Sequence, residues 1–146
     1  MFKALASAVL AVGLSLSAAA QDKLLYELRT YHAEPGKLDA LLTRFRDHTC
    51  KLFEKHGMTN VGYWVPVENK DNVLIYLLSY PDKAARDTAW KGFLGDEEWK
   101  KAAAASEANG KLIGKIDELY LSSTDFSPGF PGSGNAGADR VFEMRT

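Results

Sequence analysis

The chain has 146 residues, with 18 basic and 19 acidic side chains and a formal net charge of −1. This near balance argues against a protein that is steered by charge to nucleic acid or to an anionic membrane surface. The single cysteine, Cys50, excludes an internal disulfide, so the fold must be held together by packing.

The first twenty residues have the composition of a secretory signal peptide. Lys3 precedes an apolar run from residue 4 to residue 16, and small residues follow it. Ala18 and Ala20 suit the small pockets of a signal peptidase, so we expect cleavage before Gln21 and a periplasmic or secreted protein. The apolar run is shorter than the roughly 20 residues that span a bilayer. The remaining chain of about 126 residues is the size of one domain.

The mature domain opens with a strand and a helix. Residues 24–32 alternate between two kinds of side chain, which predicts a strand, and Glu34-Pro35-Gly36 ends it. From Lys37, apolar residues recur at spacings of three and four as far as Phe53, which predicts an amphipathic helix. Gly57 follows at the position where a left-handed residue ends a helix.

Three further strands and a broken helix follow. Residues 58–67 are rich in β-forming residues, and residues 73–80 are almost entirely apolar, which predicts a strand covered on both faces. A second helix, N-capped by Asp82, breaks before Asp96, which caps a third and shorter helix. Residues 113–122 form the last predicted strand.

The order β-α-β-β-α-β, with the second helix broken in two, is that of a ferredoxin-like α+β fold with a four-stranded antiparallel sheet. Both helical layers then cover one face of the sheet and leave the other bare. Trp64, Tyr76 and Leu119 cannot all lie beneath the helices, and a bare apolar face is usually buried by a partner. We therefore predict a homodimer in which two sheets face each other to form an α/β-barrel.

The tail of the chain carries a partial repeat. A Gly/Pro-rich stretch over residues 126–138 predicts an irregular linker. Beyond it, residues 141–146 (VFEMRT) match the type of residues 25–30 (LYELRT). We interpret residues 127–146 as a linker and the truncated first strand of a second copy of the domain at 21–126, with chance similarity as the alternative. A lone strand is not stable in water, so we expect this tail to be dispensable for stability.

Four segments, in their order and spacing, resemble the NIPSNAP family: YELRTYHAEPGKLDALLTRFRDHT, LFEKHGMTNVGYWVP, NVLIYLLSYPD and AWKGFLGDEEW. The resemblance covers residues 24–126. It implies a ferredoxin-like domain of the dimeric α/β-barrel type, often in tandem pairs. It implies little about chemistry, because the animal members are linked to mitochondria, vesicle traffic and mitophagy signalling and the bacterial members generally lack an assigned reaction. A secretory signal departs from the mitochondrial pattern.

Glu27, Arg29 and Tyr31 share one face of the first strand. If Tyr26 and Leu28 face the helices, this polar face lines the interior of the barrel. Arg29 then either fixes an anionic or carbonyl group of a ligand beside Tyr31, or only pairs with Glu27 to set the strand register, which we favour. The candidate ligand-binding residues are Glu27, Arg29, Tyr31, Trp64 and Tyr76.

Two histidines lie on the first helix. His48 and His56 are eight residues apart, or about 12 Å along the axis, too far to share one metal ion, so we expect no metal site. His48 is a weak candidate for a general base, although such a histidine is more often a packing residue. Trp90, Phe93 and Trp99 fall at helical spacing and are predicted to belong to the core. The weak catalytic candidates are His48, Arg29 and Tyr31.

The sequence has no phosphate loop, nucleophile elbow, Cys-x-x-Cys or His-Glu-x-x-His motif. The leading hypothesis is an exported domain that acts by dimerisation and binding of a partner or a small apolar ligand, without a cofactor. The alternatives are a cofactor-independent monooxygenase- or isomerase-like enzyme with an apolar or aromatic substrate, and a haem or porphyrin carrier. An enclosed cavity of about 300 Å³ or more, lined by Arg29 and Tyr31, would favour ligand chemistry, and a filled barrel interior would favour association alone.

Overall fold

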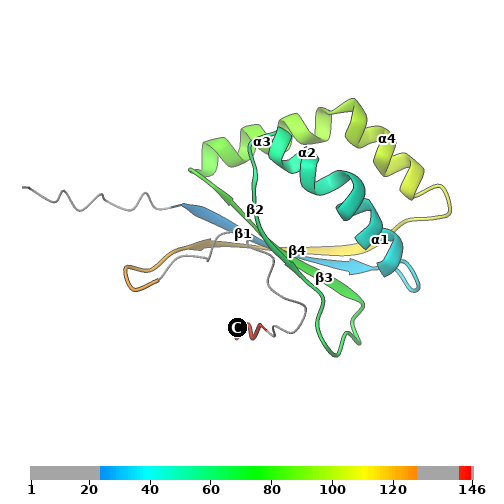
Figure 1. Cartoon of the computed structure of the whole chain (residues 1–146), viewed down its shortest axis with the longest axis horizontal. Helices are drawn as coiled ribbons and strands as arrows, with labels where there is room; N and C mark the ends of the chain where they lie inside the picture. Colours follow the sequence, from blue (N-terminus) through cyan, green and yellow to red (C-terminus); the bar gives the residue numbers. More distant parts are fainter. Residues whose placement is uncertain (1–23, 128–141, 146) are drawn as a thin grey trace, which may run out of the picture.

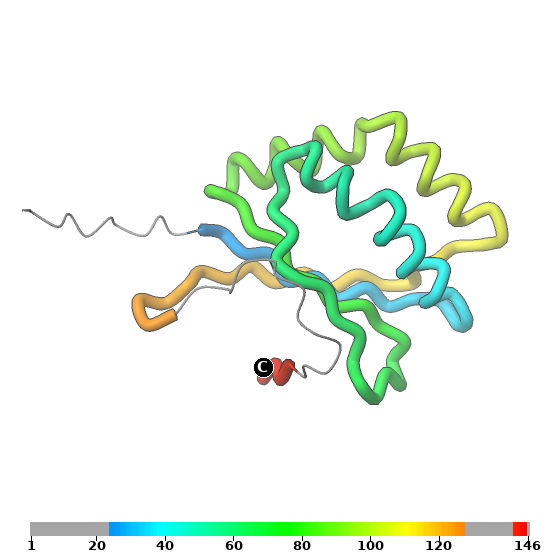
Figure 2. Tube along the Cα trace, in the orientation of Figure 1, coloured from blue at the N-terminus to red at the C-terminus, as the bar shows by residue number. Residues whose placement is uncertain are grey.

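The computed structural model describes residues 24–127 and 142–145. Figure 1 shows the helices on one face of a four-stranded sheet, and Figure 2 shows the same path as a tube. The elements are β1 Leu25–Ala33, α1 Leu38–Arg44, the π-helical turn η1 Phe45–Thr49, α2 Cys50–Lys55, β2 Thr59–Trp64, β3 Val73–Tyr80, α3 Lys83–Gly95, α4 Glu97–Ser106 and β4 Ile113–Ser122. All pairings are antiparallel, in the order β2-β3-β1-β4. The predicted ferredoxin-like α+β fold is confirmed.

The first predicted helix contains a π-helical turn, η1, between α1 and α2. Leu41, Phe45, Thr49 and Phe53 recur at a spacing of four and are all buried. In a straight α-helix of 3.6 residues per turn, such a row drifts around the axis. The wider π turn absorbs this drift and keeps the row against the core. The hydroxyl of Thr49 donates to the carbonyl of Arg44 at 3.2 Å, which gives this buried hydroxyl a partner.

The predicted helix ends are confirmed. The carboxylate of Asp82 accepts a hydrogen bond from the backbone of Ala85 at 2.8 Å, and Asp96 accepts one from Glu98 at 2.8 Å. Gly57 takes a positive φ of 82° after α2, a conformation that a side chain with Cβ resists. These local signals set where α3 and α4 begin and where the chain turns back into β2.

The assumed orientation of β1 is wrong. Glu27, Arg29 and Tyr31 point toward the helices and are buried, whereas Tyr26 and Leu28 lie on the open face and are partly exposed. Buried charges are tolerated only when they are paired and hydrogen-bonded, and this part of the fold provides the partners. The polar side chains of β1 therefore lie between the sheet and the helices.

The open face of the sheet is rich in apolar side chains. Of the three residues that were not expected to fit together beneath the helices, Trp64 and Leu119 lie on this face, and Leu119 is 49% exposed. Tyr76 lies on the other face and is completely buried in the core, stacked on Tyr63 with ring centroids 5.4 Å apart. β4 is an edge strand that is exposed along almost its whole length. Within the described residues, no helix covers this face (Figure 1).

The described part of the tail, residues 142–145, lies on the open side of the sheet (Figure 1). The ring of Phe142 meets Trp64 edge to face with centroids 5.9 Å apart, and Phe142 remains 56% exposed. Such a pair is worth about 0.5–1.5 kcal/mol, so dispensability of the tail stays a prediction. The expected signal peptide (1–20) lies outside the described residues, as do residues 128–141 and 146 of the expected linker and truncated strand (127–146).

Candidate ligand pocket

A cavity of about 420 Å³ lies between the helices and the sheet and is open to solvent on one side, so it is a cleft and not the enclosed cavity considered from the sequence. Aromatic rings form much of its wall: Tyr31, Phe45, Phe53, Trp90, Phe93 and Trp99. Arg29, Arg44 and Arg86 also line it, together with the carboxylates of Glu107 and Glu118. An apolar cavity with a few placed polar groups is the usual form of a small-molecule site.

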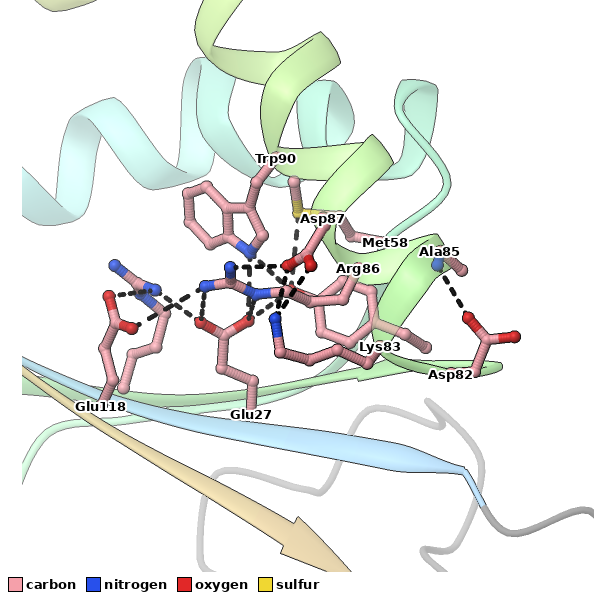
Figure 3. Close-up of polar contacts among 11 residues, drawn as sticks. Glu27, Met58, Asp82, Lys83, Ala85, Arg86, Asp87, Trp90 and Glu118 are labelled. Atoms are coloured by element: carbon pink, nitrogen blue, oxygen red, sulfur yellow. Dashed lines mark hydrogen bonds and ion pairs between the residues drawn. The ribbon is translucent and has the colours of Figure 1, made fainter.

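Glu27 organises the polar groups beside the cavity. Figure 3 shows Arg86 and Trp90 of α3 reaching Glu27 on β1. Arg86 donates to both carboxylate oxygens, at 2.7 and 3.1 Å. Further hydrogen bonds come from Arg29 at 2.6 Å, Tyr80 at 2.8 Å and Trp90 at 3.0 Å. Burial raises the pKa of Glu27, but these hydrogen bonds outweigh it and lower the pKa to about 2. Glu27 is therefore ionised at neutral pH.

Arg29 bridges two carboxylates. Its Nη1 lies 2.6 Å from Glu27 and 2.7 Å from Glu118 across the β1–β4 pair, so the pairing with Glu27 expected from the sequence is present. The guanidinium lies over the ring of Trp90, 4.3 Å from its centroid, and within 5.5 Å of the Tyr31 ring. Burial disfavours its charge, but neighbouring tyrosines and Glu27 raise the pKa of Arg29 overall.

Arg44 is the last residue of α1 and also lines the cavity. Its Nη1 is 3.3 Å from the hydroxyl of Ser106 and 3.4 Å from Glu107, and its guanidinium is 5.2 Å from the centroid of the Trp99 ring. Burial lowers the pKa of Arg44, and the charge of Glu107 offsets this only in part. Arg44 is therefore a buried cation with long, weak contacts.

The structure brings some of the predicted site residues together and separates others. Glu27, Arg29 and Tyr31 gather at one region, and Tyr31 packs edge-on against Tyr76 with centroids 5.1 Å apart. Trp64 is on the opposite face of the sheet. His48 is exposed on η1 and is not part of the cavity lining.

Sequence reasoning missed Arg44, Arg86 and Glu118 as site residues. Arg86 precedes Trp90 by four positions, so both lie on one face of α3. This spacing is the sequence signal from which Arg86 could have been predicted to lie beside the core. In the described ranges, no group of three His, Cys, Asp or Glu side chains is placed to hold a metal ion. No helix in the same ranges is long and apolar enough to cross a membrane.

The topology and the cavity define a ferredoxin-like α+β domain with space for a small ligand between sheet and helices. The chain belongs to the NIPSNAP family, whose profile matches residues 26–128. Protein NipSnap homolog 3A from Homo sapiens is 31% identical over 81 residues, which is 55% of this chain and 32% of that protein. The match thus spans about a third of the length of this curated relative, and it confirms the resemblance seen in the sequence.

Solved structures share the fold. A NIPSNAP family protein of unknown function from Agrobacterium tumefaciens aligns with a TM-score of 0.65 and 20% identity, over 74% of this chain and 95% of that one. A candidate antibiotic biosynthesis monooxygenase from Caulobacter crescentus aligns with a TM-score of 0.50 and 19% identity, over 71% of this chain and 92% of that one. At these identities the likeness concerns the fold alone.

Proposed function

We propose that this domain binds a small apolar or aromatic molecule in the cavity between its helices and its sheet. The observation that carries the proposal is the cavity of about 420 Å³ lined by Arg29, Tyr31 and a wall of aromatic rings. Ligand sites have volumes of roughly 300 Å³ or more. The cavity is open to solvent on one side, which gives a small molecule a route into it.

The polar groups in the cavity and beside it favour binding over catalysis. Both oxygens of Glu27 are engaged by donors and its pKa is about 2, so it is a poor base at neutral pH. His48 lies outside the cavity lining. We therefore assign Glu27 the role of holding Arg29 and Arg86 in place.

A large side chain placed inside the cavity should weaken the binding of a ligand there. Ala103 of α4 lines the cavity, and Ala104 beside it is exposed. We expect Ala103→Phe to weaken binding of 2-naphthamide, an uncharged aromatic probe, by roughly tenfold or more, equivalent to about 1.4 kcal/mol. Quenching of the fluorescence of Trp90 and Trp99 reports the binding. Ala104→Phe is the matched control and should bind like the parent; equal binding by both variants would place the probe elsewhere.

The second candidate function is a cofactor-independent monooxygenase-like activity on an aromatic substrate. The observation in its favour is the buried guanidinium of Arg29 against the ring of Trp90, which can stabilise an oxyanion on a bound aromatic ring. This activity predicts oxygen uptake with a naphthol substrate that is lost in Arg29→Gln. Binding without oxygen uptake favours the first function.

We also propose that the domain forms a homodimer through the open face of its sheet, because apolar side chains gather there without a covering helix in the described ranges. Sedimentation at micromolar concentration should give at least twice the mass of one chain. Leu119→Lys should shift the protein to monomer, since a charge in an apolar interface is costly. Val67→Lys, at a position 90% exposed, is the control. A parent protein that sediments as a monomer would contradict the dimer.

The expected export stays a proposal. It is supported by the apolar run and by the small residues Ala18 and Ala20 ahead of Gln21. N-terminal sequencing of the secreted or periplasmic protein should begin at Gln21, and recovery of intact Met1 in a membrane fraction would contradict it.

A further inference from the structure

The three arginines of the cavity differ in how well their charge is matched. Arg86 has hydrogen bonds of 2.7 and 3.1 Å to Glu27. Arg29 lies 2.6 and 2.7 Å from two carboxylates. Arg44 has one carboxylate within reach among the described residues, that of Glu107 at 3.4 Å. That carboxylate is 38% exposed and shares its oxygen with the backbone N–H of Leu112.

Arg44 is nevertheless as deeply buried as the better-matched Arg29. Its side chain is 4% exposed, and its Nε–H, like that of Arg29, is fully buried with no acceptor among residues 24–127 and 142–145, so the Nε–H groups do not distinguish the two arginines. The difference lies in the contacts of the Arg44 guanidinium, which are long, at 3.3 and 3.4 Å. A buried charge that is poorly paired costs free energy that an incoming anion would recover. Burial also lowers the pKa of Arg44. This agrees with the long contacts, because both indicate that the charge of Arg44 is only partly compensated.

The surroundings of Arg44 suit the body of a flat ligand. The ring of Trp99 lies 5.2 Å from the guanidinium, and Phe45 follows Arg44 in the chain and lines the same cavity. The π turn η1 keeps Phe45 and Thr49 on the cavity side directly after Arg44. A cation beside aromatic walls is an arrangement that receives an aromatic ring carrying an acidic group.

We propose that the ligand of this cavity is an aromatic carboxylic acid whose carboxylate binds Arg44. The inference rests on the proposed ligand-binding function. The two terminal Nη groups of one guanidinium match the two oxygens of a planar carboxylate, whereas the fully buried Nε–H has almost no surface that a ligand could reach. A doubly charged phosphate would lie beside the carboxylates of Glu107 and Glu118 with a single under-matched arginine to compensate it, so a singly charged acid fits better.

A pair of isosteric probes tests the role of the charge. 2-Naphthoate and 2-naphthamide have the same ring and nearly the same shape, and only the first carries a charge. We expect the parent protein to bind the naphthoate about 10- to 100-fold more tightly than the amide, the range for a hydrogen-bonded contact to a charged group. In Arg44→Gln, the ratio of the two dissociation constants should fall toward one.

Two further variants complete the experiment. Arg46→Gln removes the same charge from an exposed position two residues away and should leave the ratio at the parent value. Arg44→Lys keeps the charge and should retain part of the preference, which also gives a readout if Arg44→Gln does not fold. Equal binding of both probes by the parent, or a preference that survives in Arg44→Gln, overturns the carboxylate site alone. Failure of the parent to bind either probe contradicts the proposed function as well.

Discussion

Replacing Glu27 by glutamine is expected to lower the free energy of unfolding at pH 7 by about 3–5 kcal/mol, the usual cost of removing one partner from a buried ion pair. Glu27 is completely buried, and its neutral replacement leaves Arg29 and Arg86 facing an amide instead of a charge. Urea unfolding followed by circular dichroism measures the change. Glu97→Gln, at an exposed ion pair with Lys100, is the control and should cost less than about 1 kcal/mol.

The contribution of Glu27 to the free energy of unfolding should depend on pH. Its pKa of about 2 in the folded state lies below the ordinary value of 4.5, so the folded state favours the ionised form. The stabilisation is therefore fully present above pH 4.5 and is lost as the pH falls toward 2. We expect the difference between the parent and Glu27→Gln to shrink by about 3 kcal/mol across this window. A difference that does not change with pH would show that Glu27 is not held as a carboxylate.

Replacing Trp90 by alanine is the second change with a large expected effect. Trp90 is 9% exposed and packs edge-on against Phe53 and Phe93, with ring centroids 5.5 and 5.6 Å away. Its indole N–H also donates to Glu27 at 3.0 Å. Truncation of a buried tryptophan costs about 3–5 kcal/mol, a large part of a typical stability of about 5–15 kcal/mol. Thermal unfolding should show a clearly lower melting temperature.

Trp64 offers a matched control for Trp90. It lies on the open face and is only partly buried. Trp64→Ala should therefore cost less than Trp90→Ala in the monomer, because less apolar area returns to water. If the Trp90→Ala variant has the melting temperature of the parent, the assignment of Trp90 to the core is wrong. The role of Trp90 is then confined to contact with a ligand.

The strands and helix ends were largely predictable because they follow from local chemistry. β3 and β4 have the predicted bounds, and Asp82 and Asp96 cap their helices as predicted. β2 is shorter than the predicted segment 58–67 and ends at Trp64, two residues before Pro66, which has no N–H to donate to a sheet. Hydrophobic pattern and capping thus suffice for the topology.

The orientation of β1 was not predictable from its own residues. Alternation shows that Glu27 and Arg29 share a face, and the ordinary rule places charged side chains away from the core. The structure places them inward because Arg86 comes from α3, 59 residues along the chain, to complete the pairing. Such compensation by a distant element is invisible in a local pattern.

Arg44 was missed for a different reason. In a regular helix, the stripe through Leu41 and Phe45 marks the buried face, and a charged residue at its margin is expected to extend to solvent. The packing of α4 over this margin buries Arg44 beside Trp99 and Ser106. Burial of this kind depends on how the two helical layers meet, which the sequence of either one does not reveal.

The most direct test of ligand binding in this cavity is a crystal structure of the protein with 2-naphthoate. We expect the naphthalene ring between the sheet and the helices, in contact with Phe45 and Trp99, and its carboxylate within about 3 Å of Arg44. Two results would contradict ligand binding in this cavity. One is a ligand found only on the open face of the sheet, and the other is a cavity filled by rearranged side chains with no ligand bound.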